Sequence, residues 1–201
     1  MKARKLVADK DKLAYIIGLA LGDGNLSNPN GRAVRLRITC DVKYPKLIQR
    51  IKATIQHVLP ENKVSIVLRK KNCVDVSCFS NHWEAILGWY VGKGSKFAQK
   101  VSVPDWIKTN ADYAKWCLKG LIETDGSVYF DRGYPMVMYT SIIPNLTNDA
   151  NSMIELLGFK PHIYQIIPQN RKDNYNHQKI YHIRLSKNVT DFLAVVKPEK
   201  N

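Results

Sequence analysis

The hydrophobic positions of this chain follow two different periods. Residues 13–22 are uncharged and apolar on every side, which predicts a helix in the interior of the protein. Over residues 34–39, apolar side chains alternate with Arg and Thr, which predicts a strand with one buried and one exposed face. Leu47, Ile51 and Ile55 then follow a helical spacing. The pattern therefore predicts helices mixed with half-buried strands.

The same arrangement occurs twice. Residues 15–24 align with residues 117–126 at an offset of 117 − 15 = 102, and residues 74–81 align with residues 181–188 at a slightly larger offset. We expect two copies of one α-β-β-α-β-β-α unit, joined around residues 94–110. The predicted elements after each opening helix are 34–39, 47–58, 64–69, 74–79 and 81–90 in the first copy, and 134–140, 147–157, 162–167, 180–185 and 188–196 in the second.

This order predicts an α+β protein made of two pseudo-symmetric repeats, residues 1–100 and 101–201. A length of 201 residues is compatible with two units of about 100. Each repeat would hold one sheet covered by helices on one face, which leaves the other face open to a partner.

Small residues mark one side of each opening helix. Gly18 and Gly22 lie four residues apart, and Gly120 and Thr124 take the equivalent places in the second copy. Small side chains at this spacing let two helix backbones approach closely, although each Gly lowers helix propensity by about 1 kcal/mol. We therefore expect these four residues to form an interface between the two opening helices. The alternative is that each helix packs on its own sheet, with Gly as a small filler.

Both opening helices end in Asp-Gly. Gly24 and Gly126 are suited to the left-handed conformation that terminates many helices. Asp23 and Asp125 place negative charge at the helix end where the dipole favours cations. A single Asp-Gly is usually only a turn. If the two helices pair, however, the carboxylates lie side by side and offer hard oxygen ligands to Mg²⁺, so the pattern predicts a divalent-metal site.

The charge of the chain is high and unevenly distributed. With 31 Lys and Arg against 17 Asp and Glu, the net charge is +14 and the pI is about 9.6, which indicates a polyanionic partner, above all nucleic acid. Residues 1–100 hold 19 − 7 = +12, and residues 101–201 hold 12 − 10 = +2. The first copy should therefore make most of the contacts with phosphates.

The sequence also indicates a compartment. Four cysteines are scattered without a CxxC pair, which favours reduced thiols. No secretory signal is recognisable, and no uncharged run reaches the ~18 residues that a membrane span needs. We expect an intracellular, reducing location, the cytoplasm of a prokaryote or an organelle matrix, and no membrane contact.

The segments 18–24 (GLALGDG) and 120–126 (GLIETDG) resemble the two LAGLIDADG motifs of the monomeric homing endonucleases. The likeness covers nearly the whole chain, because the order of helices and strands also matches. The resemblance implies paired motif helices, saddle-shaped antiparallel sheets along the major groove of a long double-stranded DNA target, and a monomer. It also implies Mg²⁺-dependent cleavage of both strands, with Mn²⁺ or Ca²⁺ able to occupy the same sites.

The resemblance assigns site residues as well. The last acidic position of the motif is the catalytic one, and it falls on Asp23 and Asp125. The preceding residues, Gly22 and Thr124, belong to the same metal site. The earlier acidic position departs from the pattern in the first copy only. A lysine after the last helix of each unit completes the active sites. The candidates are Lys96 and Lys197.

The exposed strand faces should carry the residues that read DNA. Arg is suited to guanine and Gln to adenine in the major groove, whereas a solvated or phosphate-only role is the alternative for any single residue. The candidates are Arg32, Arg35, Arg37, Arg69, Lys70 and Lys71 in the first copy, and Tyr129, Arg132, Tyr139, Gln165, Gln169, Arg171, Lys172, Lys179, His182 and Arg184 in the second.

The sequence therefore predicts a sequence-specific endonuclease with one active site per DNA strand. Two alternatives stay open at this point. One is a protein of the same fold that does not cleave, either an intron RNA maturase or a DNA-binding regulator. The other is a structural or adaptor domain with accidental Asp-Gly turns. Both acidic residues are present, which favours the nuclease, since a pure binder does not need two crowded acids.

Overall fold

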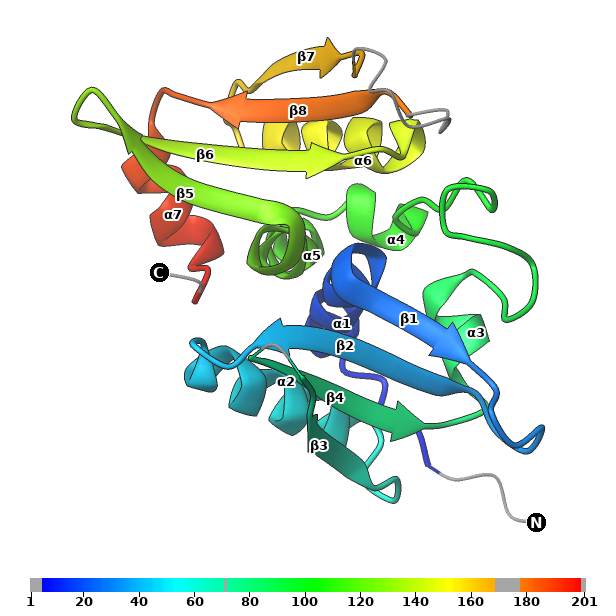
Figure 1. Ribbon diagram of the computed structural model, residues 1–201. Helices are drawn as coiled ribbons and strands as arrows, with labels where there is room; N and C mark the ends of the chain where they lie inside the picture. The colour runs from blue at the N-terminus through cyan, green and yellow to red at the C-terminus, as the bar shows by residue number, and fades with distance from the viewer. Residues whose placement is uncertain (1–4, 71, 169–177, 200–201) are drawn as a thin grey trace.

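The computed structural model describes residues 5–70, 72–168 and 178–199, and it contains two antiparallel four-stranded sheets with helices (Figure 1). The predicted α+β class with two similar repeats is confirmed. The first repeat consists of α1 (Lys10–Asp23), β1 (Gly24–Ser27), β2 (Arg35–Asp41), α2 (Pro45–Val58), β3 (Val64–Leu68), β4 (Cys73–Phe79) and α3 (Trp83–Leu87). The second consists of a short α4 (Asp105–Lys108), α5 (Ala111–Asp125), β5 (Gly126–Asp131), β6 (Tyr134–Ser141), α6 (Pro144–Leu156), β7 (His162–Ile166), β8 (Ile180–Leu185) and α7 (Val189–Val196).

The two sheets have the same topology. The strand order is β1-β2-β4-β3 in the first sheet and β5-β6-β8-β7 in the second. Thr39 lies opposite Asp75 in the first sheet, and Thr140 lies opposite His182 in the second. Each Thr is the residue after the one that pairs with the final Gly of the motif, so the two pairs occupy equivalent positions.

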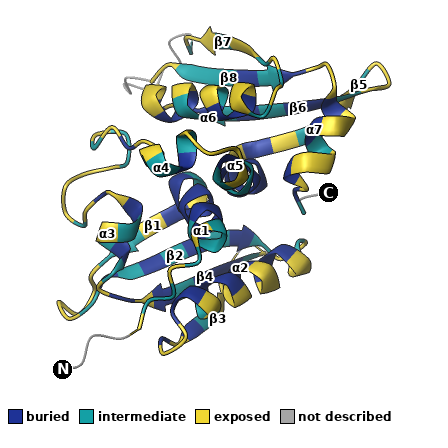
Figure 2. Ribbon diagram, turned by 180° about the vertical axis from the view of Figure 1, so that it is seen from behind, coloured by how far each residue is buried: buried dark blue, intermediate teal, exposed yellow. Residues whose placement is uncertain are grey.

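Each sheet is covered by helices on one face only. Helix α2 lies behind the first sheet and α6 behind the second in Figure 1, and both lie in front in the reverse view of Figure 2. The uncovered faces of the two sheets therefore point to the same side of the molecule. Along β2, buried Leu36 and Ile38 alternate with half-buried Arg35, Arg37 and Thr39, so the predicted alternation is confirmed.

Helices α1 and α5 pack on each other at the centre of the molecule (Figure 1). A Cβ atom added to Gly120 would lie 2.6 Å from both Leu19 N and Tyr15 O, and one added to Gly18 would collide with the carbonyl of Cys117. The two backbones thus touch where the glycines lie. In the part of the chain that the structure describes, no helix is long and apolar enough to cross a membrane.

The glycines that follow the two Asp residues are not left-handed, contrary to the expectation from sequence. Gly24 has φ −76° and ψ 145°, and Gly126 has φ −94° and ψ 162°, so each continues directly into a strand. A Cβ atom on Gly126 would lie 2.6 Å from Ile122 Cα, and Gly24 is equally crowded by Ala20. Glycine is needed there for close approach to the preceding helical turn.

The helix predicted over residues 81–90 is shorter than expected. Helix α3 covers only Trp83–Leu87 and ends at Gly88, whose φ of +76° is a conformation that favours glycine. The segment from there to α4 is irregular and contains Lys96, so the early end of α3 leaves this lysine free to approach α1.

Candidate active site and nucleic-acid interface

Asp23 and Asp125 are the last residues of the paired helices α1 and α5, and both are exposed. The helix pair holds them close to each other's backbone, because a Cβ atom on Gly22 would lie 3.2 Å from Asp125 Oδ2. This space next to Gly22 is one that any side chain would fill. Two carboxylates therefore lie between the uncovered faces of the two sheets, at the negative ends of two helix dipoles.

Lys96 lies beside Asp125 in one of two pockets at this centre. Its Nζ donates to the carbonyl oxygens of Leu21 at 2.6 Å, Ala20 at 3.2 Å and Gly22. These are end carbonyls of α1 that the helix itself leaves without partners. Burial lowers the pKa of the Lys96 ammonium, and the charges of Asp125 and Asp23 oppose that shift. Lys96 therefore senses both carboxylates.

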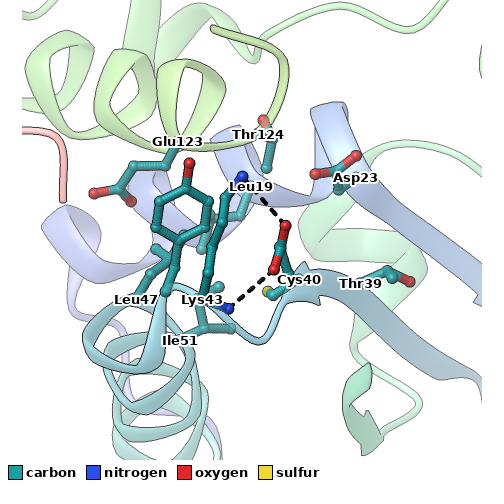
Figure 3. A pocket seen from close by; sticks show the side chains of 11 residues that line it. Leu19, Asp23, Thr39, Cys40, Lys43, Leu47, Ile51, Glu123 and Thr124 are labelled. Carbon is teal, nitrogen blue, oxygen red and sulfur yellow. Dashed lines mark hydrogen bonds and ion pairs between the residues drawn. The ribbon is translucent and has the colours of Figure 1, made fainter. Parts of the chain in front are cut away.

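The pocket on the other side holds Asp23 and a lysine that the sequence analysis did not select (Figure 3). Lys43 follows β2, and its Nζ lies 3.3 Å from Asp41 Oδ2. The hydrogen bond to Asp41 raises the pKa of Lys43. Glu123 and Thr124 reach the same pocket from α5. Only the course of the loop after β2 reveals this position, since no motif marks Lys43.

Lys197 does not line either pocket in the described part of the chain. Its side chain is exposed, and its residue ends α7 in a left-handed conformation with φ 50°. Its carbonyl oxygen accepts a hydrogen bond from Lys119 of α5. The placement of Lys197 as the second active-site lysine was therefore wrong, because the chain holds this residue by its backbone and turns its side chain to solvent.

Glu123, at the earlier acidic position of the second motif, is buried in a polar cluster. It accepts hydrogen bonds from Tyr15 Oη at 2.5 Å and from the backbone N–H of Glu199 at 2.8 Å, and Lys119 Nζ lies 2.7 Å away. Burial, followed by the charge of Glu123, raises the pKa of Tyr15 well above its usual value. Glu123 therefore ties α5 to α1 and to the C-terminal segment.

The residues at the helix ends fit a divalent cation only in part. The carboxylates of Asp23 and Asp125 are hard ligands on the exposed side, and Mg²⁺ commonly needs only one or two such groups, with water and phosphate completing its shell. The Gly22 carbonyl already accepts a hydrogen bond from Lys96, and Thr124 Oγ1 donates to the carbonyls of Gly120 and Leu121. No group of three or more His, Cys, Asp or Glu that could hold a metal is found among residues 5–70, 72–168 and 178–199. The two Asp residues are thus the fitting ligands, with Thr124 serving the helix interface.

The open face of the first repeat is rich in arginine. Arg35 Nε donates to Ser27 Oγ at 3.2 Å, and Arg37 lies 3.8 Å from Asp75. Arg69, at the end of β3, lies 3.4 Å from the same carboxylate. Arg32 and Lys70 are exposed in the loops beside this face. Lys71 lies outside the described residues.

The open face of the second repeat has aromatic, imidazole and thioether groups. His182 is stacked with Tyr164 at a ring separation of 5.0 Å, and Thr140 Oγ1 lies 2.9 Å from His182 Nδ1. Burial lowers the pKa of His182. Arg184 pairs with Asp131 of β5 at 2.8 Å. This face therefore carries much less free positive charge than the first.

Two residues selected as DNA contacts do not lie on the open face. Tyr139 is buried between Val137 and Ser141 on the helix-covered side of β6, because side chains alternate along a strand. Gln165 pairs with Tyr181 and shares that covered side by register. The remaining candidates divide simply. Tyr129 on β5 is half-buried and faces the open side, Arg132 and Lys179 are exposed beside the sheet, and Gln169, Arg171 and Lys172 lie outside the described residues.

Comparisons with known proteins follow this geometry. Residues 112–197 match the family model described as a LAGLIDADG-like domain. A structure of the homing endonuclease I-DmoI aligns with a TM-score of 0.66 at 17% identity, over 96% of this chain and 98% of that one. The N-terminal LAGLIDADG domain of DUF199/WhiA aligns with a TM-score of 0.60 at 12% identity, over 95% and 84%.

A curated sequence relative is a DNA polymerase of Thermococcus sp. (strain GE8), 22% identical over 181 residues. The match takes 87% of this chain but only 10% of the polymerase, so the chain spans about a tenth of that relative. The family model and the shared fold agree with the two helix-end motifs. The chain is a two-repeat LAGLIDADG protein with the fold of the homing endonuclease I-DmoI.

Proposed function

We propose that this protein is a sequence-specific DNA endonuclease that cuts both strands of a long target with a divalent metal. One observation carries the proposal: Asp23 and Asp125 end two helices whose backbones touch, and they lie between two open sheet faces that point to the same side. Crowded carboxylates at helix ends destabilise a protein that only binds. A single chain with both carboxylates would act as a monomer.

The residues of the centre divide the work. Asp23 and Asp125 would hold Mg²⁺, which when bound neutralises the scissile phosphate and activates water. Lys96 keeps the end carbonyls of α1 occupied and places positive charge beside Asp125, where it can stabilise charge that develops on the phosphate. Lys43 takes the corresponding place beside Asp23. The arginine-rich and aromatic faces would bind the two halves of the target.

The structural neighbours support this reading. I-DmoI has been solved with its target DNA in the presence of Mg, and with DNA and Mn or Ca. The net charge of +14 favours a polyanionic ligand. The four cysteines are free thiols, which supports our proposal of a reducing compartment inside the cell.

The test is cleavage of a randomised double-stranded DNA library with Mg²⁺, followed by sequencing of the cut ends. The control is the variant with both Asp23→Asn and Asp125→Asn. We expect the wild type to release double-strand cuts at one family of sequences and the control to release none. A wild type that enriches a DNA sequence by binding but never cuts it would establish the non-cleaving alternative, which the match to the WhiA domain keeps open.

A further inference from the structure

A carboxylate lies on the open face of the first repeat, where it opposes the binding of a polyanion. Asp75 is on β4, one of the two central strands of the sheet, and its side chain is directed to the same face as Arg37 and Thr39. A negative charge at this place weakens the attraction for phosphate. It needs an explanation other than direct contact with DNA.

Asp75 is nearly buried beneath its neighbours. The residue is 8% exposed, and its side chain is 11% exposed, whereas the side chains of Arg37 and Arg69 are 28% and 48% exposed. The arginines therefore extend farther from the sheet than the acid does. A DNA base or phosphate on this face would meet the guanidinium groups first, with the carboxylate beneath them.

Three side chains converge on this carboxylate from both neighbouring strands. Thr39 Oγ1 on β2 donates to Asp75 Oδ1 at 2.8 Å, which fixes the orientation of the carboxylate. Its other oxygen, Oδ2, lies 3.8 Å from Arg37 Nε and 3.4 Å from Arg69 Nη1. Arg37 and Arg69 approach diagonally across the sheet, one from each side. One acid thus orients two arginines.

The guanidinium of Arg37 keeps donors for a ligand. Among the described residues, Arg37 Nε is buried and makes no hydrogen bond, while its Nη2 lies 3.4 Å from Asn25 Oδ1. The ion pair with Asp75 therefore holds the group in place without consuming its N–H donors. An arginine held in one orientation loses less conformational entropy when it binds, and its planar fork is suited to the two acceptors of guanine.

We propose that Asp75 is a positioning residue that fixes Arg37 and Arg69 for base recognition, and so sets the base preference of one half of the DNA site. The inference rests on the proposed binding of DNA by this face. The second repeat differs at the equivalent position, where His182 pairs with Thr140 and no carboxylate is present. The half of the site bound by the second repeat should not depend on Asp75.

The experiment is selection by binding from a randomised double-stranded DNA library in EDTA, so that no strand is cut. The wild type is compared with Asp75→Asn, in which the new amide still accepts the hydrogen bond from Thr39. A well-oriented arginine gives a preference of roughly 5- to 150-fold for one base. In Asp75→Asn we expect that preference to fall severalfold at positions in one half of the site only. Binding to random-sequence duplex should tighten, because one negative charge is lost.

Asp131→Asn is the matched control, since it removes the acid that pairs with Arg184 on the other open face. It should leave the Asp75-dependent positions unchanged. Arg37→Gln and Arg69→Gln form the second set of variants, in case Asp75→Asn does not fold. Their lost positions should overlap with those of Asp75→Asn, and the double variant with Arg37→Gln should lose little more at a shared position.

The outcomes separate the two proposals. If the wild type enriches no sequence, the proposed function fails and this inference fails with it. If the wild type enriches a sequence and Asp75→Asn enriches it with the same preference at every position, only the role of Asp75 is overturned. Loss of preference in both halves, or a uniform loss of affinity in Asp75→Asn, would also overturn it.

Discussion

The pockets beside Asp23 and Asp125 occupy equivalent places in the two repeats, but their other charges differ. The Asp23 pocket also contains Asp41 and Glu123, and Lys43 there is paired with Asp41. Among the described residues, the Asp125 pocket has Lys96 and no second carboxylate.

The sheet pairings explain part of this difference. Ile38 and Tyr139 pair with the two motif glycines, so the place of Asp41 on β2 corresponds to Ile142 after β6. Duplication has thus kept the carboxylate at each helix end while the surrounding residues have diverged. We expect the two DNA strands to be cut at different rates.

Replacing either carboxylate should have the largest effect. Asp23→Asn and Asp125→Asn each remove a hard oxygen ligand, and we expect double-strand cleavage to fall by about 10³-fold or more, because metal catalysis supplies several kcal/mol. Binding of DNA should be retained. Strand-resolved gels with Mg²⁺ would show whether each variant still nicks one strand. Asp105→Asn, an exposed carboxylate on α4, is the control and should cut normally. Cutting of both strands at the wild-type rate by either variant would refute the assignment.

The two lysines test the asymmetry directly. Lys96→Met should slow one strand by about 10²-fold, since Lys96 is partly buried and its charge is weakly screened. Lys43→Met should slow the other strand by only about tenfold, because its charge is exposed to solvent and already shared with Asp41. The measurement is the rate of nicking of each strand, with exposed Lys93→Met as control. Equal effects on both strands would mean that the pockets act as one site.

The helix interface is the symmetric part of the molecule, and glycine variants probe it. In an exposed helix, Gly→Ala stabilises by up to about 1 kcal/mol. Gly18→Ala and Gly120→Ala should instead destabilise by about 1–3 kcal/mol, because each new Cβ would meet the backbone of the partner helix. Urea unfolding measures this, and Ala53→Leu on the exposed side of α2 is the control for added bulk. A gain in stability at either glycine would show that the backbones do not touch there.

Salt dependence compares the two open faces, with the smallest expected effect. Lys70→Gln removes an exposed charge beside the arginine-rich face, so the slope of log affinity against log salt should flatten by at most about 0.9. The loss of affinity should be alike for all sequences, whereas Arg184→Gln on the second face should weaken particular base pairs. Titrations at several salt concentrations on selected and random duplexes measure both. A selective loss in Lys70→Gln would contradict our division between anchoring and reading residues.

Local patterns predicted most of the fold. Strands such as β2 and β8 and helices such as α2 follow from periods of two and 3.6, because burial of one face sets these periods in the sequence. The helix pair followed from small residues at matching positions. The conformation of Gly24 was mispredicted, since a glycine required for close approach looks the same in a sequence as one required for positive φ.

The site was less predictable than the fold. Both carboxylates could be located because each ends a recognisable helix. Lys43 and Lys197 could not be placed correctly, since their positions depend on loop paths and chain ends that carry no period. Tyr139 was chosen for its chemistry, although its alternation with Val137 indicates the covered side of the sheet. Asp75 escaped notice because only strand register brings it beneath two arginines.

The contact between the backbones of α1 and α5 also has a consequence for synthesis on the ribosome. Helix α1 ends at residue 23, and α5 ends at residue 125, so the Gly18 side of α1 remains uncovered until about 100 more residues have been made. At about 5–20 residues per second, this interval lasts roughly 5–20 s. During that time an apolar surface without its partner is exposed to the cell. Conditions that slow translation between the two helices should therefore lower the yield of soluble protein without changing the stability of the finished molecule.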